Sequence, residues 1–231
     1  MEMKQFSKVL VANRGEIAIR IFRACNDLGL HTVAIYSKED TYSMFRTRAD
    51  EAYLIGENDT PLGAYLDIPA IITLAKHHGV DAIHPGYGFL SENADFARAV
   101  EKAGIAFIGP TPHSIEMLGV KSTAREIALK AGVAVTPGSD GIVGKNYHAV
   151  AKKIGFPIMI KATLGGGGKG MRICRSDAEV EINMELCQAE AKNFFGNPDV
   201  YAEKYLENPR HIEVQILADS FGNVVHLGER D

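Results

Sequence analysis

Short apolar runs and amphipathic segments alternate along the first half of the chain. Residues 8–13 (KVLVAN) form a continuous apolar run, which is typical of a strand buried on both faces of a parallel sheet. In residues 16–28 the apolar positions recur at helical spacing, and Gly29 follows the last of them. The pattern therefore predicts a buried strand followed by a helix that ends at Gly29.

The same alternation continues as far as residue 108. It predicts strands over 31–37, 51–55, 81–84 and 106–108, a short helical stretch after Thr41, and helices over 68–78 and 93–102. Ser91 is the expected N-cap of the last of these helices. Because strands and helices follow one another at the spacing of right-handed βαβ units, we expect an open parallel sheet with helices on both faces.

The second half of the chain has a different pattern. Short helices are predicted over 110–118 and 122–131, and a connector over 132–138 marks a domain boundary. Beyond it we expect a helix over 148–154, strands over 157–162 and 171–175, a long helix over 177–195 capped by Ser176, and strands over 200–206, 211–218 and 224–227, the last two joined by a turn at 219–223. The expected organisation is an α/β domain at 1–118, a helical connector at 119–138, a second domain at 139–206 and the first strands of a further part at 207–231.

Residues 165–168 are four consecutive glycines, flanked by Lys161 and Lys169. Glycine loses more backbone freedom on folding than any other residue, so a compact domain that contains such a run is expected to use its bare backbone. Converging N–H groups beside two lysines suit a phosphate. A strand rather than a helix follows the glycines, which excludes a P-loop and predicts a glycine hairpin that closes over a nucleotide. The alternative is a mobile linker with incidental lysines.

Two loops of the first domain offer further candidates. The first strand-to-helix turn, residues 12–16, lacks the GxGxxG pattern, so a dinucleotide is not expected there. Arg14 and Glu16 lie just beyond a strand's carboxyl end, where they either line a pocket or form a local ion pair. Residues 84–93 form a structured loop whose side chains either contact a ligand or only turn the chain.

Composition narrows the function classes. The 231 residues are 46% hydrophobic and carry a net charge of −4, so no bulk attraction to nucleic acid or to an anionic membrane is expected. No apolar run of about 18 residues and no secretory signal is present, and we expect a cytoplasmic protein. Three cysteines without metal-ligand spacing predict neither disulfides nor a zinc site, and Cys25 is expected in the core.

Four long motifs, in the same order along nearly the whole chain, together resemble a known family. They are ANRGEIAIRIFRA at 12–24, DAIHPGYGFLSEN at 81–93, IKATLGGGGKGMR at 160–172 and EKYLENPRHIEVQILAD at 203–219. The sequence resembles the biotin carboxylase module of the ATP-grasp superfamily. The stretches at 34–41, 50–57 and 64–72 are more similar to pyruvate carboxylases than to the stand-alone biotin carboxylase subunit of acetyl-CoA carboxylase.

The resemblance implies a fold and a set of binding residues. The fold is a Rossmann-like domain at 1–118, an α+β ATP-grasp lid subdomain at 139–206, and the first strands of a truncated carboxyl-terminal ATP-grasp half at 207–231. The resemblance implies that Lys121 and Lys161 bind the phosphates of ATP and that Gly167 and Gly168 cover them. It implies that the adenine is bound by backbone groups of Glu203, Lys204, Tyr205 and Leu206. It also places His211 near the ribose and Glu213 in the same cleft. Without the resemblance, we would interpret Lys121 as an ordinary surface lysine.

The implied reaction is phosphoryl transfer from MgATP to bicarbonate, which gives carboxyphosphate, followed by carboxylation of biotin. Positioning and charge neutralisation drive such chemistry, which agrees with lysines and amides but no nucleophilic triad. The catalytic residues and the Mg²⁺ ligands are expected beyond Asp231, so we expect the isolated chain to lack bicarbonate-dependent ATPase activity. The implied partners are a biotinylated carrier domain and a carboxyltransferase domain within a homo-oligomer.

Three positions depart from the family's pattern, and three other functions remain open. Leu164 stands where a small residue is common and Lys169 where arginine is common, and Val120 stands where aspartate is usual, which weakens the assignment of Lys121. The chain is alternatively part of the biotin carboxylase subunit of acetyl-CoA carboxylase, a binding module without turnover, or part of another ATP-grasp ligase such as carbamoyl phosphate synthetase. Stimulation of ATPase activity by biotin would separate the last alternative from a biotin carboxylase.

Overall fold

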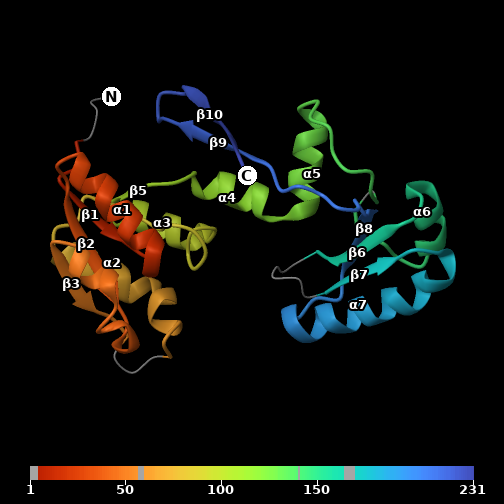
Figure 1. Cartoon of the computed structure of the whole chain (residues 1–231), viewed down its shortest axis with the longest axis horizontal. Coiled ribbons are helices and arrows are strands. Elements are labelled where there is room, and N and C mark those ends of the chain that lie inside the picture. The colour runs from red at the N-terminus through yellow and green to blue at the C-terminus, as the bar shows by residue number, and fades with distance from the viewer. Residues whose placement is uncertain (1–4, 57–59, 140, 164–169) are drawn as a thin grey trace. The chain divides into compact units, whose positions relative to one another are not determined.

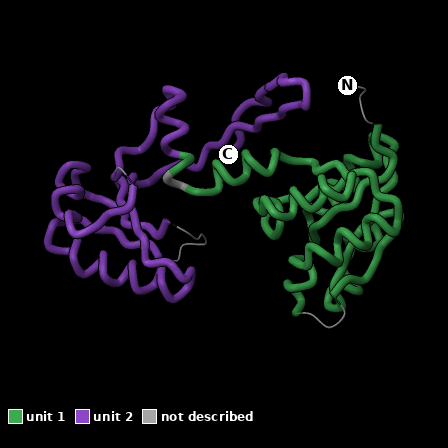
Figure 2. The backbone as a smooth tube through the Cα atoms, turned by 180° about the vertical axis from the view of Figure 1, so that it is seen from behind, with its two compact units in different colours: residues 1–124 green, residues 125–231 purple. Residues whose placement is uncertain are grey.

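The computed structural model describes residues 5–56, 60–139, 141–163 and 170–231. The chain divides into two compact units, Met1–Ala124 and Arg125–Asp231, which are coloured separately in Figure 2 and are described in turn.

The first unit is a mixed α/β structure built on a parallel sheet (Figure 1). Its elements are β1 (Lys8–Val11), α1 (Gly15–Asp27), β2 (His31–Tyr36), β3 (Glu51–Leu54), α2 (Ile68–His77), β4 (Ala82–His84), α3 (Ala94–Lys102), β5 (Ala106–Phe107) and α4 (Pro112–Gly119), with short 3₁₀ segments at Lys38–Asp40, Met44–Arg48 and Gly63–Leu66. The strand order is β3-β2-β1-β4-β5, and every pair of neighbours is parallel. The predicted open parallel sheet is confirmed.

Helices cover both faces of this sheet, as the alternation predicted. Val9 and Val11 of β1 pack in one core with Phe22 of α1. Leu10, between them, packs in a second core with Ile71 of α2 and residues of α3. Since neighbouring side chains of a strand point to opposite faces, β1 is buried on both sides. Cys25 lies in the first core with 7% of its surface exposed, as predicted.

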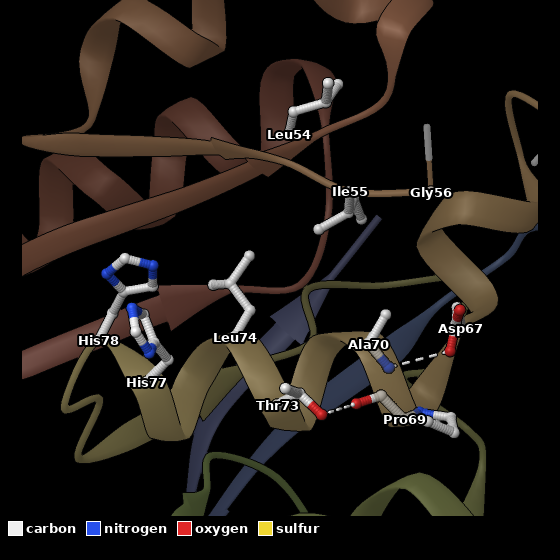
Figure 3. Close-up of a pocket in the computed structure, with 10 residues that line it drawn as sticks. All are labelled: Leu54, Ile55, Gly56, Asp67, Pro69, Ala70, Thr73, Leu74, His77 and His78. Carbon is white, nitrogen blue, oxygen red and sulfur yellow. Dashed lines mark hydrogen bonds between the residues drawn. The ribbon is translucent and has the colours of Figure 1, made fainter. Parts of the chain in front are cut away.

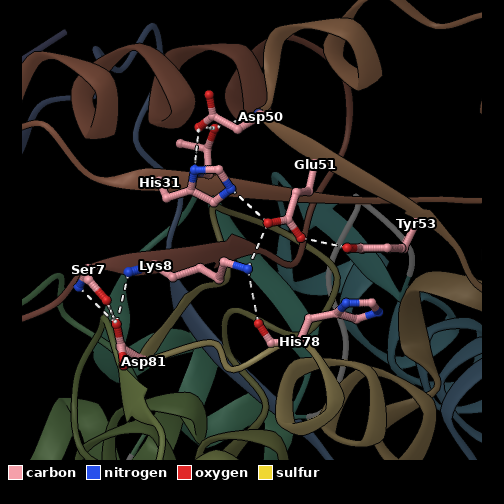
Figure 4. A network of polar contacts seen from close by, with 9 residues as sticks. Ser7, Lys8, His31, Asp50, Glu51, Tyr53, His78 and Asp81 are labelled. Atoms are coloured by element: carbon pink, nitrogen blue, oxygen red, sulfur yellow. Dashed lines mark hydrogen bonds and ion pairs between the residues drawn. The ribbon is translucent and has the colours of Figure 1, made fainter.

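A polar network joins the amino ends of three neighbouring strands (Figure 4). Lys8 begins β1, His31 begins β2 and Glu51 begins β3. The Glu51 carboxylate accepts a hydrogen bond of 2.7 Å from Lys8 Nζ and lies 2.7 Å from His31 Nε2, while Tyr53 donates to its other oxygen. These contacts fix the start of the edge strand β3 against the centre of the sheet.

The predicted cap of α3 is wrong. The helix begins at Ala94 and its N-cap is Asn93, whose Oδ1 accepts a hydrogen bond of 2.9 Å from Phe96 N. Ser91 lies two residues earlier and its amide donates to Gly88 O within the loop. Both residue types cap helices well, so the sequence alone did not decide between them.

The second unit contains a three-stranded antiparallel sheet with helices on one face. Its elements are α5 (Lys121–Lys130), which begins in the first unit, α6 (Tyr147–Ile154), β6 (Ile158–Ala162), β7 (Met171–Cys174), a 3₁₀ segment (Asp177–Glu179), α7 (Val180–Phe195), β8 (Val200–Lys204), β9 (Glu213–Ala218) and β10 (Val224–Arg230). The strand order is β7-β6-β8. Ile158 and Ile160 of β6 pack with Met184 and Cys187 of α7, and Ala151 of α6 joins the same core.

Two predictions for the second unit need correction. Ser176 does not cap the long helix, because Asp177–Glu179 forms a 3₁₀ turn and the Ser176 hydroxyl contacts the Glu179 side chain instead. The last strand extends from the predicted 224–227 to Arg230, since a bulge between His226 and Glu229 allows pairing with β9 to resume. The predicted turn between β9 and β10 is confirmed, and Asp219 Oδ1 accepts hydrogen bonds from the amides of Phe221 and Asn223.

Candidate functional site

Among the described residues, α6 and α7 pack on one face of the sheet β7-β6-β8. Strand register places Lys161 opposite Met171 of β7 and Tyr201 of β8, and Met159 opposite Glu203. These five side chains therefore lie on the face turned away from the α7 core. We call this set, Met159, Lys161, Met171, Tyr201 and Glu203, the open face. It combines thioether and aromatic surface with one cation and one carboxylate.

Lys161 and Glu203 form an ion pair on the open face. Their side chains are 24% and 21% exposed, so water screens the pair only in part. The pair joins neighbouring strands diagonally, because Lys161 is in register with Tyr201, two residues before Glu203. The structure therefore places the sequence-predicted phosphate ligand Lys161 beside the first residue of the predicted adenine segment.

Backbone hydrogen bonds within the protein already use some of the N–H donors of the predicted adenine-binding segment, residues 203–206. The Lys204 amide donates to Pro137 O at 2.7 Å and the Tyr205 amide donates to Pro157 O at 3.0 Å, so both donors are occupied. The Lys204 ammonium donates to the carbonyls of Gly155 and Phe156 at 2.9 and 2.6 Å. It therefore holds the connection before β6. Among the described residues, the amide of Leu206 donates to no acceptor, which leaves it as the donor suited to a base edge.

Arg125 was not predicted from the sequence, yet it lies beside the open face. The connector before α6 runs along the outer edge of β8, where Gly138 bridges to Glu203. A Cβ placed on Gly138 would lie 3.3 Å from Glu203 Cβ and 3.4 Å from Arg125 Cζ. Arg125 also donates a hydrogen bond to Thr136 O. The guanidinium is thus a second cation near the Glu203 side chain.

The pKa of Tyr201 responds to both Glu203 and Arg125. Burial raises the pKa of Tyr201 to about 12, the carboxylate of Glu203 adds to that rise, and Arg125 opposes it. The Tyr201 hydroxyl is therefore neutral at physiological pH and offers the open face a polar group without charge. Strand alternation could have found Tyr201 and Met171, because both are in register with Lys161.

The beginning of β7 is held by α7. Gly170 has a φ of +65° and its would-be Cβ lies 3.0 Å from Ala162 Cβ, so the position requires glycine. Cys187 Sγ donates to Gly170 O at 3.0 Å, and the Gly170 amide donates to Glu190 Oε2 at 3.3 Å. Glu190 also pairs with Arg172. Burial raises the pKa of the Cys187 thiol to about 11, which agrees with a structural role.

Among the described residues, no contact joins the remaining predicted ATP-binding residues to the open face. Gly167 and Gly168 lie outside the described residues, and so does the side chain of Lys121, although its backbone begins α5. His211 is exposed just before β9. Glu213 begins β9 and forms an ion pair of 2.5 Å with Arg230 of β10.

In the first unit, the carboxyl ends of β1 and β2 form a closed polar cluster. Arg14 donates to both oxygens of Asp40 at 2.6 and 2.5 Å, and Tyr65 donates to the same carboxylate at 2.7 Å. The hydrogen bond from Arg14 holds the pKa of Asp40 well below its usual range. Of the two readings of Arg14, the local ion pair is the one observed. Glu16 accepts a hydrogen bond from Tyr87, which belongs to the loop 84–93.

The first unit also has a shallow hollow between the end of β3 and α2 (Figure 3). Its volume is about 500 Å³, and Leu54, Gly56, Pro69, Leu74 and the two histidines at 77 and 78 contribute to its lining. None of the described residues that line it is a lysine or an arginine that could neutralise phosphate. The hollow therefore does not offer the chemistry of the open face.

Among residues 5–56, 60–139, 141–163 and 170–231, no group of three or more His, Cys, Asp or Glu side chains is placed to hold a metal ion. In the same part of the chain, no helix is long and apolar enough to cross a membrane.

Two family models match the chain in succession. The model described as biotin carboxylase, N-terminal domain, matches residues 5–115, and the one described as carbamoyl-phosphate synthase L chain, ATP binding domain, matches residues 120–231. Residues 5–115 therefore match the biotin carboxylase N-terminal domain, and residues 120–231 match an ATP-binding domain. The second match contains the whole sheet β7-β6-β8, so the open face lies in the part that matches an ATP-binding domain.

Similar proteins are carboxylases. The chain is 59% identical over 234 residues to the pyruvate carboxylase of Bacillus subtilis and 55% identical over 233 residues to the mitochondrial pyruvate carboxylase of Mus musculus. In both comparisons the match covers 100% of this chain and 20% of the relative, so the chain spans about a fifth of the length of these curated relatives.

Solved biotin carboxylase structures have the same fold. The biotin carboxylase domain dimer of Hydrogenobacter thermophilus 2-oxoglutarate carboxylase, in complex with MgADP, ADP and bicarbonate, matches with a TM-score of 0.90 and 51% identity, over 98% of this chain and 50% of that one. The Campylobacter jejuni biotin carboxylase in complex with β-γ-ATP matches with a TM-score of 0.91 and 43% identity, over 97% and 51%. The fold class and the family expected from the motifs are confirmed.

Proposed function

We propose that this chain is the amino-terminal, nucleotide-binding part of a biotin carboxylase that carboxylates biotin with ATP and bicarbonate through carboxyphosphate. The observation that carries the proposal is the open face, where a partly buried lysine lies among methionine and tyrosine side chains within a matched ATP-binding domain. Apolar surface beside a lysine suits a nucleotide, because the base needs desolvated contacts and the phosphates need positive charge.

The proposal assigns separate tasks to the residues of the second unit. Lys161 neutralises phosphate charge, and the Leu206 amide donates to the adenine edge. On the resemblance to the family, Lys121, Gly167 and Gly168 also act on the phosphates, while His211 and Glu213 lie near the ribose. The described residues do not offer a ligand set for Mg²⁺, so no step is assigned to the metal. Biotin is the proposed carboxyl acceptor.

We further propose that the longer protein is a pyruvate carboxylase, with a biotinylated carrier domain and a carboxyltransferase domain as its partners, in a homo-oligomer. The identity to pyruvate carboxylases over the whole of this chain supports this choice. In the longer protein, ATP hydrolysis is expected to depend on bicarbonate and to rise with free biotin, and carboxylation is expected with pyruvate rather than with 2-oxoglutarate or acetyl-CoA. ATPase activity that responds to ammonia or glutamine instead of biotin would contradict the proposal.

Calorimetric titration of the 231-residue chain with MgADP tests the nucleotide site directly. Lys161→Met is expected to weaken binding at least about tenfold, because a partly buried phosphate contact loses its charge. Lys152→Met is the matched control, since Lys152 is an exposed lysine of α6 that pairs with Asp177 away from the open face. Equal affinities of the two variants would remove Lys161 from the site.

A further inference from the structure

Glu203 lies between two cations on one side of the sheet. Lys161 forms an ion pair with its carboxylate, and the Arg125 guanidinium lies beside the same side chain at Gly138. We propose that Glu203 changes partner when nucleotide binds: it holds Lys161 in the empty site and pairs with Arg125 once phosphate takes the Lys161 ammonium. This inference rests on the proposed function, because it concerns the affinity of that same site.

Phosphate and the Glu203 carboxylate compete for the Lys161 ammonium. Both are anions, and Lys161 is partly buried, so the ion pair is only partly weakened by water. A phosphate that binds Lys161 therefore has to displace the carboxylate or share the ammonium with it. Competition of this kind lowers the affinity for nucleotide by the free energy of the existing pair.

Glu203 cannot follow Lys161 through a backbone movement. Glu203 lies inside β8, paired with Met159 on one side and bridged to Gly138 on the other. The next residue, Lys204, is held by its amide and its ammonium. By contrast, the lysine side chain has a flexible four-carbon stem. The ammonium therefore moves towards phosphate while the carboxylate stays near β8.

A Glu203 carboxylate left without a cation would repel the bound phosphates. An unpaired, partly buried charge is strongly unfavourable, whereas a second cation removes that cost. Arg125 is placed for this task because its Cζ and the Glu203 Cβ lie on the same side of Gly138, at 3.4 and 3.3 Å from the point that a Cβ on that glycine would occupy. Donation to Thr136 O uses only part of the guanidinium's donor set. Arg125 is thus a positioning residue for the site.

The test is a double-mutant cycle on MgADP affinity, measured by calorimetry on the 231-residue chain at fixed ionic strength. Glu203→Gln is expected to bind MgADP about fivefold more tightly than the wild type, and Arg125→Met about tenfold more weakly. In the Glu203→Gln background, Arg125→Met is expected to change the affinity less than about twofold. Arg125→Lys keeps the charge and is expected to restore affinity to within about threefold of the wild type.

Glu181→Gln is the control for a change of net charge, because Glu181 is exposed on α7, which packs on the opposite face of the sheet. Equal or weaker binding by Glu203→Gln would overturn the exchange, as would an Arg125→Met effect of the same size in both backgrounds. Failure of the wild type, the Glu203→Gln variant and the control alike to bind MgADP would contradict the proposed function and this inference with it. Weak binding by Lys161→Met alone, with no coupling between Glu203 and Arg125, would contradict only the exchange.

Discussion

Asn13 and Gly86 are in such close contact that no side chain fits between them. Asn13 is buried and donates to Pro85 O at 2.7 Å and to Tyr87 O at 2.8 Å, so it joins the turn after β1 to the loop after β4. A Cβ on Gly86 would lie 2.7 Å from Asn13 Nδ2 and 3.1 Å from its Cγ. Asn13 therefore holds the loop after β4 in place and also restricts position 86 to glycine.

Gly86→Ala is therefore expected to destabilise the protein by about 2–5 kcal/mol, the sum of left-handed backbone strain and the disturbed Asn13 hydrogen bonds. Gly79→Ala is the matched control: its φ of +64° is nearly the same as the +66° of Gly86, but its Cβ would meet no atom within 4 Å. We expect the control to cost only the strain, about 1–2 kcal/mol. Urea denaturation of both variants measures the difference, and equal losses would show that Asn13 imposes no restriction.

The cap of α3 gives a second prediction. Asn93→Ala is expected to lower the free energy of unfolding by about 1 kcal/mol, because the Phe96 amide loses its acceptor. Ser91→Ala is expected to cost less, since the structure gives the Ser91 side chain no capping role. Equal losses, measured by thermal or urea denaturation, would contradict the assignment of Asn93.

The network at the strand starts predicts a pH dependence. Hydrogen bonding, chiefly from Lys8, lowers the pKa of Glu51 from 4.5 to about 2. A carboxylate whose pKa is lower in the folded state stabilises the protein above its unfolded pKa, and this contribution is lost as the pH falls through the folded pKa. Glu51→Gln is therefore expected to be less stable than the wild type at neutral pH and to lose less stability between pH 4.5 and 2.

Urea titrations across that pH range measure the effect, and Glu101→Gln, at an exposed position of α3, is the control. A Glu51→Gln variant whose stability falls with acid as steeply as that of the wild type would show that this carboxylate is not linked to folding.

Cys187 gives a prediction about reactivity. Its thiol is buried, its pKa is raised to about 11 and it donates to Gly170 O, so little thiolate exists at about pH 8. Iodoacetamide is expected to leave it unmodified in the native protein and to modify it after denaturation, as peptide mass spectrometry would show. Rapid alkylation of the native protein would mean that α7 opens readily beside Gly170.

Sequence patterns predicted the strands of the site and Lys161, but not Arg125, which is the second cation near Glu203. The alternation along β6 and β8 is enough to separate Lys161 and Glu203 from the buried Ile160 and Ala202. Arg125 left no such signal. Arg125 lies in α5 and meets the connector at Thr136 and Gly138, and the connector pairs with β8 through backbone hydrogen bonds, which do not depend on side-chain type.

The β1 strand has a consequence for how the first unit opens. Val9 and Val11 belong to one core and Leu10 to the other, so neither layer can separate from the sheet while the other keeps its packing around β1. Native-state hydrogen exchange should therefore find amides of α1 and of α3 protected with similar opening free energies, as one cooperative unit. The exchange data would then show that the two cores of this unit unfold in a single cooperative step.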